Sequence, residues 1–236
     1  MSPKTNHEAA LCYDIQPTKI MTDRLLPLPL PALTLIPDFT AQQPESLHVK
    51  ERDTWKRKQN SYTVSRLTAA GKPGDAYLQV LGESRKEVSI QTADGRELMR
   101  ISKENSLLKG TVYHGMSAQG DELWTLKVKS SVLKDKWGES RGACTEGVAL
   151  MRIDLVVHDA SLSGRTIEIA KIDTLNANKG VIIDGHPAVA MGQKGFWSHT
   201  HREDVVSVAP GIDIVLAVAV TWAKIDQEND AMGASV

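Results

Sequence analysis

Cysteine is nearly absent from this sequence, which has only Cys12 and Cys144 among 236 residues. The two cysteines lie in unlike contexts, so they form neither a disulfide framework nor the repeated spacing of a cysteine-rich metal site. No charged start followed by a continuous apolar stretch is present, so the sequence does not indicate a signal peptide. These absences predict a reducing, cytoplasmic environment, and they are also compatible with a nuclear or membrane-peripheral location.

Aromatic side chains are scarce as well, at 5% of residues, and they are not interleaved with basic residues. A stacking surface for nucleic acid is therefore not expected. The chain also lacks G-x-S-x-G, a Walker-type loop and G-x-G-x-x-G, which removes the usual grounds for a hydrolase, an NTPase or a dinucleotide-binding domain. Cys144 has no local signature of a nucleophile–base pair, and we expect a structural cysteine there. We predict no cofactor, and the balance leans away from an enzyme.

The longest apolar segment, residues 212–225, is too short to cross a bilayer. Of its fourteen residues only Asp213, Thr221 and Lys224 are polar. As a helix it would span about 21 Å, against the ~30 Å of a bilayer's hydrocarbon core, so we predict no transmembrane span. A helix without a polar face must be surrounded by protein. Asp213 suits the N-cap of such a helix, whereas the many β-branched residues leave a long buried strand as the alternative.

Charge is balanced overall, with a net value of −1, but it is unevenly distributed. Residues 46–142 contain 18 Lys and Arg against 12 Asp and Glu, whereas residues 143–236 contain 7 against 12. A basic region can attract phosphates or an anionic membrane surface. The alternative is that regions of opposite sign face each other within the fold.

The pattern along the chain divides it into three parts. Residues 1–45 form an irregular leader, because leucine alternates with proline over residues 25–31 and proline removes backbone donors. This leader could be a linker, could pack its leucines on the domain, or could recruit a protein partner. Residues 46–226 form a single domain of about ten short strands with frequent turns, which predicts an antiparallel sandwich or barrel. Residues 227–236 are expected to be a flexible tail.

Four segments resemble one known family, the LURP-one-related proteins of the tubby C-terminal-like and phospholipid scramblase group. Residues 47–50 (LHVK) and 61–64 (SYTV) look like the family's opening strands. Residues 122–129 (ELWTLKVK) are similar to its pattern G-E-E-L-F-T-V-K-K. Residues 208–213 (VAPGID) are close to V-A-P-G-V-D, which leads into the family's final helix.

The resemblance implies a mainly β fold, a closed antiparallel barrel of about twelve strands around a buried C-terminal helix at about residues 212–225. Its structural signature in this sequence comprises Pro210, Gly211, Asp213 and Trp222, and we expect Trp222 to fill the core. Members of the wider group bind phosphoinositides or act at membranes. The resemblance therefore implies a non-catalytic binding or scaffold protein that contacts anionic lipid headgroups or a membrane surface.

Two sets of residues are candidates for a site. Two lysines on the polar face of a predicted strand and two in the connection after it could bind an anion, unless they form a solvated strand face: Lys127, Lys129, Lys134 and Lys136. Residues two apart on a strand point to the same side, so His199 and His201 could share a metal ion beside Trp197, unless they belong to a polar loop. The second set supports an alternative function, an enzyme or small-molecule carrier of a specialised pathway with a barrel-mouth pocket near residues 192–204.

Overall fold

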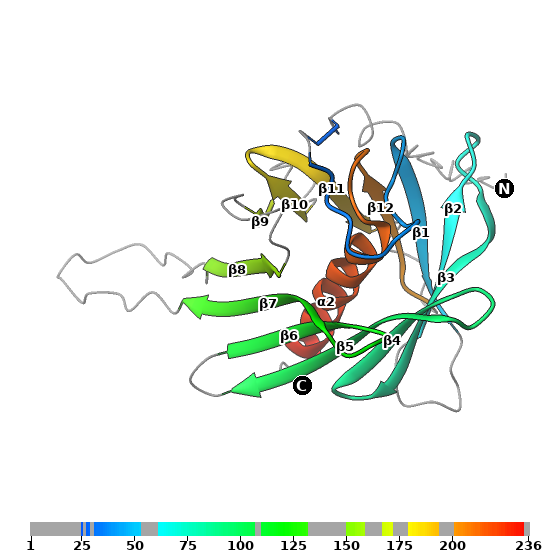
Figure 1. Ribbon diagram of the computed structural model, residues 1–236. Helices are drawn as coiled ribbons and strands as arrows, with labels where there is room; N and C mark the ends of the chain where they lie inside the picture. Colours follow the sequence, from blue (N-terminus) through cyan, green and yellow to red (C-terminus); the bar gives the residue numbers. More distant parts are fainter. Residues whose placement is uncertain are drawn as a thin grey trace, which may run out of the picture.

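The computed structural model describes residues 25, 27–28, 31–52, 61–106, 110–131, 150–158, 167–171, 179–193 and 201–233. In these residues the chain forms twelve strands followed by one helix (Figure 1). The elements are β1 (Glu45–Glu51), β2 (Tyr62–Leu67), β3 (Pro73–Ser84), β4 (Glu87–Thr92), β5 (Glu97–Ser106), β6 (Gly110–Ser117), β7 (Glu122–Ser131), β8 (Leu150–Val157), β9 (Ile167–Lys171), β10 (Lys179–Ile183), β11 (His186–Gln193), β12 (Glu203–Val208) and α2 (Ile214–Gly233).

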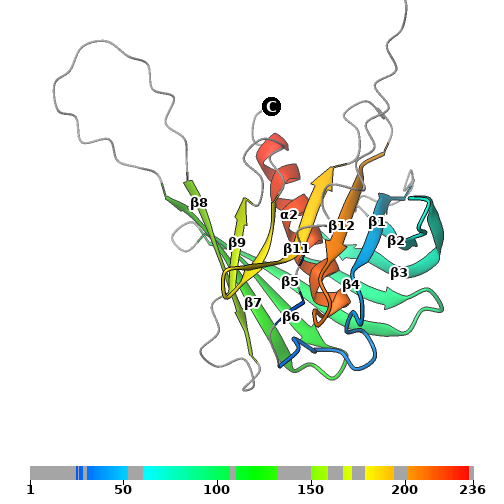
Figure 2. The ribbon, with the colours of Figure 1, turned by 90° about the horizontal axis from the view of Figure 1, so that it is seen from above.

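Neighbouring strands are antiparallel throughout, and short turns connect many of them. The order around the sheet is β1-β12-β11-β10-β9-β8-β7-β6-β5-β4-β3-β2, and β2 pairs again with β1. The thinnest join within the described residues is between β8 and β9, where Asp154 pairs in register with Glu168. The sheet curls round α2, as the view from above shows (Figure 2). We call this wrapped sheet the barrel.

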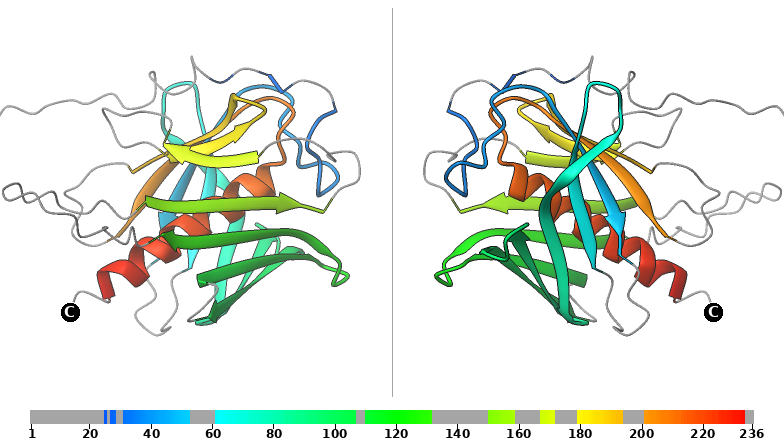
Figure 3. Two further views of the ribbon diagram at one scale, coloured as in Figure 1. Left: turned by 90° about the vertical axis from the view of Figure 1, so that its left-hand side faces the viewer. Right: turned by 90° about the vertical axis from the view of Figure 1, so that its right-hand side faces the viewer.

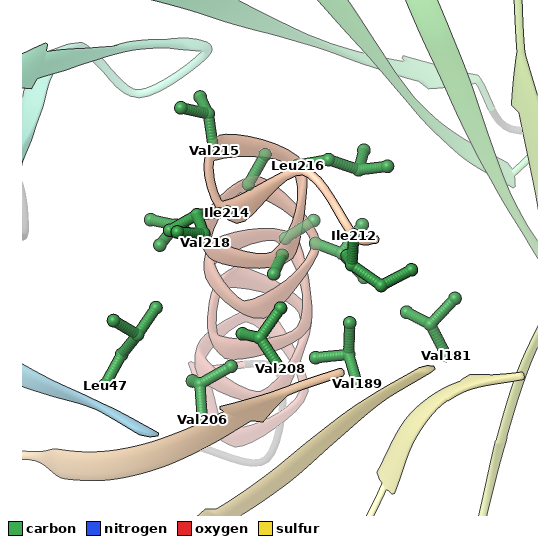
Figure 4. Close-up of a cluster of buried hydrophobic side chains, with 14 of the residues drawn as sticks. Leu47, Val181, Val189, Val206, Val208, Ile212, Ile214, Val215, Leu216 and Val218 are labelled. Carbon is green, nitrogen blue, oxygen red and sulfur yellow. The ribbon is translucent and has the colours of Figure 1, made fainter. Parts of the chain in front are cut away.

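The apolar first half of α2 fills the barrel, as the absence of a polar face predicts. Residues 214–221 are all buried, and the hydroxyl of Thr221 donates to the carbonyl of Ala217 at 2.8 Å, so its polar group is satisfied. Side chains of β1, β10, β11 and β12 pack along one side of this half of the helix (Figure 4), and buried side chains of the other strands belong to the same core. The expectation of a mainly β, antiparallel protein with one C-terminal helix is confirmed, and the alternative of a long buried strand is wrong.

Gly211 and Asp213 explain the sharp entry into α2. Gly211 has a φ of 87°, which favours glycine, and a Cβ there would lie 3.4 Å from the Cβ of Leu28. Asp213 caps the helix, since its Oδ1 accepts the amide of Leu216 at 2.9 Å. Its Oδ2 accepts the amides of two leader residues, Leu35 at 2.8 Å and Ile36 at 2.7 Å. One buried carboxylate thus joins the leader to the first turn of the helix.

The leader is more closely integrated than a separate 1–45 segment would be. Its described residues include five buried apolar side chains that belong to the core: Leu25, Leu28, Leu33, Phe39 and Ala41. Backbone bonds tie the same stretch to the residues before α2, with the amide of Leu33 donating to Gly211 at 2.7 Å and that of Ala41 to Ile212 at 2.8 Å. The packed unit therefore starts before residue 46, because these leucines cover the barrel end where α2 begins.

The helix also differs from the expected boundaries of about 212–225. It begins at Ile214, because Asp213 is the cap, and it ends at Gly233. Residues 227–233, expected in a flexible tail, are therefore helical. The physical reason is that the polar second half of α2 has charged partners on the strands, which a search for apolar periodicity does not detect.

Candidate functional site at the mouth of the barrel

The end of the barrel where α2 leaves brings together, among the described residues, a buried ion-pair network and a cavity. We call this end the mouth. There β1 ends at Glu51, β2 begins at Tyr62, β3 ends at Ser84 and β12 begins at Glu203. The last turns of α2 emerge between these strands (Figure 3).

Lys103 is buried at this end and is held by two carboxylates of α2. It follows Met99 and Ile101 at alternate positions of β5, so its side chain lies on the inner face of the sheet with theirs. Its Nζ lies 2.6 Å from Oδ2 of Asp226 and 2.5 Å from Oδ2 of Asp230. A buried ammonium needs such partners, because desolvation of an unpaired charge is costly.

Tyr113 completes this network from the neighbouring strand. Its hydroxyl donates to Oδ2 of Asp226 at 2.7 Å, and its ring meets that of Trp222 edge-on at a centroid distance of 5.8 Å. Burial raises the pKa of the Tyr113 phenol, and the charge of Asp226 raises it further, so the hydroxyl stays a donor. Burial alone would lower the pKa of Lys103, but the bonds to Asp226 and Asp230 outweigh it and the pKa is raised.

A second ion-pair set holds the opposite face of the helix. Arg202, just before β12, lies 2.6 Å from Asp204 through Nε and 2.6 Å from Glu228 of α2 through one terminal nitrogen. Lys224 approaches Glu228 at 3.8 Å. Burial would lower the pKa of Arg202, but its bonds to Asp204 and Glu228 raise it, so the guanidinium stays charged. The second half of α2 is thus clamped on two sides.

Between α2 and the turn that joins β3 to β4 lies a cavity of about 300 Å³. This volume is at the lower end of the range typical of small-ligand sites. Aromatic, carboxylate and basic side chains all contribute to its walls. The residues that line it are Tyr62, Gly82, Ser84, Arg85, Glu87, Val88, Trp222, Asp226, Asn229 and Asp230. Trp222 packs against the core as expected, and it also lines this cavity, which was not predicted.

A separate polar cluster lies on the outer face of β6, β7 and the end of β8. Glu122 Oε1 lies 2.6 Å from Nδ1 of His114, and its other oxygen lies 3.4 Å from Nε2 of His158. Thr125 Oγ1 lies 2.8 Å from the same His158 nitrogen. The hydrogen bond from His114 lowers the pKa of Glu122, so this carboxylate stays ionised beside both imidazoles. This cluster is partly exposed, but the mouth combines its charged groups with a cavity.

The predicted anion site is only partly within the described residues. Lys127 is exposed on β7, and its register partner on β8 is Asp154, so an acidic residue stands next to it. Lys129 follows two residues later and pairs in register with Arg152. The other two predicted lysines, Lys134 and Lys136, lie outside the described residues. The structure places Lys127 and Lys129 on one strand, β7, and the set of four stays a prediction.

The predicted histidine pair lies largely outside the described residues as well, since these exclude Trp197 and His199. His201 is half-buried just before β12. In the part of the chain that the structure describes, no three His, Cys, Asp or Glu side chains are arranged to hold a metal ion. In the same part, no helix is long and apolar enough to span a membrane.

Sequence reasoning missed Lys103 and its two carboxylate partners. A signal was present, because Lys103 occupies an inward position in the alternation of β5. A second signal was the spacing of Trp222, Asp226 and Asp230, which are four residues apart and so share one helix face. Neither signal identifies its partner, because the pairing of a strand with a helix 120 residues later depends on the fold.

Comparisons with known proteins support the fold and leave the activity open. No family model matches the chain, and no curated protein matches it. Among solved structures, the fold is similar to the X-ray structure of the Arabidopsis thaliana protein AT5G01750, with a TM-score of 0.51 and 13% sequence identity. The match covers 84% of this chain and 99% of the plant protein. At this identity the likeness concerns the fold alone.

Proposed function

We propose that this chain is a non-catalytic binding protein of the LURP-one-related type, with a tubby C-terminal-like closed barrel as its scaffold and the mouth cavity as its binding site. The observation that carries this proposal is the contrast between a filled interior and an open mouth. Apolar residues of α2 and the strands form one continuous core, whereas the mouth retains a cavity of about 300 Å³ with charged walls. The V-A-P-G-I-D segment at the entry to α2 supports the family assignment.

The test is to fill the cavity and measure what the protein then retains. Ser84 is exposed and lines the cavity, so Ser84→Trp should block the site without disturbing the core. Gln119→Trp is the control, because Gln119 is exposed in the turn between β6 and β7 at the opposite end of the barrel. Native mass spectrometry of protein purified from a eukaryotic host should detect a bound small molecule that Ser84→Trp loses and Gln119→Trp retains. Equal loading of both variants would contradict the proposal.

The alternative function, an enzyme or small-molecule carrier with a pocket near residues 192–204, concerns the same end of the barrel, since Arg202 binds α2 there. The two functions differ in what happens to the bound molecule. An enzyme would convert the molecule that co-purifies, whereas a binding protein or carrier would release it unchanged on denaturation.

A second candidate function is contact with an anionic membrane surface through β7. It is favoured by the exposure of Lys127 and by the register of Lys129 with Arg152. Exposed lysines close to such a surface contribute about 1 kcal/mol each. Sedimentation with vesicles that contain phosphatidylserine should weaken with salt and in the double variant Lys127→Glu, Lys129→Glu. Sedimentation that neither treatment changes would count against this function.

A further inference from the structure

The charges that line the mouth cavity are unequal in number. Among the described residues that line it, Arg85 is cationic, and Glu87, Asp226 and Asp230 are anionic. Lys103 adds a positive charge behind two of these carboxylates, but it does not line the cavity and its side chain is 4% exposed. In the described part of the lining, carboxylates therefore outnumber cationic side chains.

The two carboxylates of α2 are held in place before any ligand arrives. Lys103 binds Oδ2 of both Asp226 and Asp230, and the hydroxyl of Tyr113 also donates to Oδ2 of Asp226. In the described part of the chain, Oδ1 of each aspartate has no hydrogen bond. Side chains fixed in this way lose little conformational entropy when they bind a further donor.

Trp222 adds an aromatic side chain to the cavity from the same face of α2. It lies one turn before Asp226 and two turns before Asp230, and all three line the cavity. An indole attracts cations through its ring, and carboxylate oxygens accept charge-assisted hydrogen bonds from an ammonium group. Tyr62, from the start of β2, contributes a further aromatic ring to the lining.

We propose that the mouth cavity binds a small molecule that carries a protonated amine, with Asp226 and Asp230 as acceptors and Trp222 beside the cation. This inference rests on the proposed function, because it names the class of ligand for the same cavity. An anionic ligand would face three carboxylates and one arginine. Lys103 partly neutralises both Asp226 and Asp230, and of the two Asp230 is the more accessible, with its side chain 58% exposed against 21% for Asp226.

The probes are three molecules of nearly equal shape: 2-phenylethylamine, 2-phenylethanol and phenylacetate. Isothermal titration of the full chain at neutral pH should show that the amine binds at least about tenfold more tightly than the alcohol, and that phenylacetate binds most weakly. Asp230→Asn should weaken binding of the amine by about tenfold. Arg85→Gln should leave amine binding unchanged or strengthen it, because it removes a like charge.

Glu228→Gln is the matched control for Asp230→Asn. It removes the same charge from the same part of α2, but Glu228 binds Arg202 and does not line the cavity. It should leave amine binding within about twofold of the starting value. Thermal melts of each variant show whether the fold is retained, and Asp230 is exposed enough that we expect it to be.

The possible results distinguish failure of the amine assignment from failure of the cavity as a binding site. Equal affinity for the amine and the alcohol, or equal effects of Asp230→Asn and Glu228→Gln, would overturn the amine assignment. If phenylacetate or the alcohol binds more tightly than the amine and Ser84→Trp abolishes that binding, the amine class is overturned and the cavity remains the binding site. If no probe binds and no co-purifying molecule depends on the cavity, both the amine assignment and the proposed function fail.

Discussion

Replacing Asp213 with alanine should destabilise the protein more than any other single change at the entry to α2. The carboxylate accepts three backbone amides, those of Leu216, Leu35 and Ile36, at 2.7–2.9 Å. Alanine leaves all three donors without this acceptor. The loss affects the helix and the leader at once, although these segments are about 180 residues apart in sequence.

The magnitude follows from the separate bonds. Loss of an N-cap costs about 1 kcal/mol, and each of the two leader amides, which are partly buried, adds about 1 kcal/mol. Burial raises the pKa of Asp213, which means that keeping this charge inside the protein has its own cost, and alanine removes that cost. The net expectation is a fall of about 2–3 kcal/mol in the free energy of unfolding, or about 4–12 °C in melting temperature for a domain of this size.

Urea unfolding followed by tryptophan fluorescence measures this fall, and Asp75→Ala is the control. Asp75 is an exposed aspartate of β3, so its removal should change stability by less than about 0.5 kcal/mol. Amide hydrogen exchange should also accelerate at Leu35 and Ile36 in Asp213→Ala and remain slow in the control. If Asp213→Ala is no less stable than Asp75→Ala, the carboxylate does not join the leader to the helix as argued.

Three further predictions concern the core and the mouth. A Cβ at Gly115 would lie 2.1 Å from the buried indole of Trp124, so Gly115→Ala should lower the free energy of unfolding by about 3 kcal/mol or more, as measured with urea. The double variant Gly115→Ala, Trp124→Leu should lose less stability than the sum of the two single variants, and an additive loss would refute the steric reason. The raised pKa values of Lys103 and Tyr113 mean that the native state retains protons that the unfolded chain loses above their ordinary values of 10.5 and 10.0. Stability should therefore fall as pH rises above about 10, less steeply in Lys103→Met, and equal slopes would contradict this. Arg202→Met should accelerate hydrogen exchange in the last two turns of α2 and leave residues 214–221 protected, whereas uniform exchange along the helix would show that Arg202 is no local clamp.

The sequence predicts the buried helix α2 because this helix lacks the polar face that a surface helix has. A helix that is apolar on every side must be enclosed by protein, which predicts the burial of residues 214–221. The segments with alternating polar and apolar residues predict the strands that enclose them. The role of Pro210, Gly211 and Asp213 at the entry also follows, since a positive φ and an N-cap have recognisable residue preferences.

The mouth could not be predicted in the same way, because its contacts join residues far apart in sequence. Lys103 alone suggests a buried charge, but its partners Asp226 and Asp230 fall in a polar stretch that looks like a solvated tail. Only the packing of α2 against β5 in the folded protein shows that these residues meet. The surroundings of Lys127 on β7 were hidden for a related reason: alternation places Lys127 outward, but only the pairing with β8 shows that Asp154 stands beside it.

The length of the apolar run connects the architecture with the proposed site. A helix rises about 1.5 Å per residue, so residues 214–225 cover about 18 Å, which is close to the height of strands six to eight residues long in a tilted sheet. The first carboxylate, Asp226, follows this run at once and therefore reaches the mouth as the helix leaves the barrel. Trp222, four residues earlier, and Asp230, four residues later, line the same cavity. The segment that fills the core thus also sets the depth at which the charged groups stand, and a change of one helical turn in its length would withdraw them from the cavity.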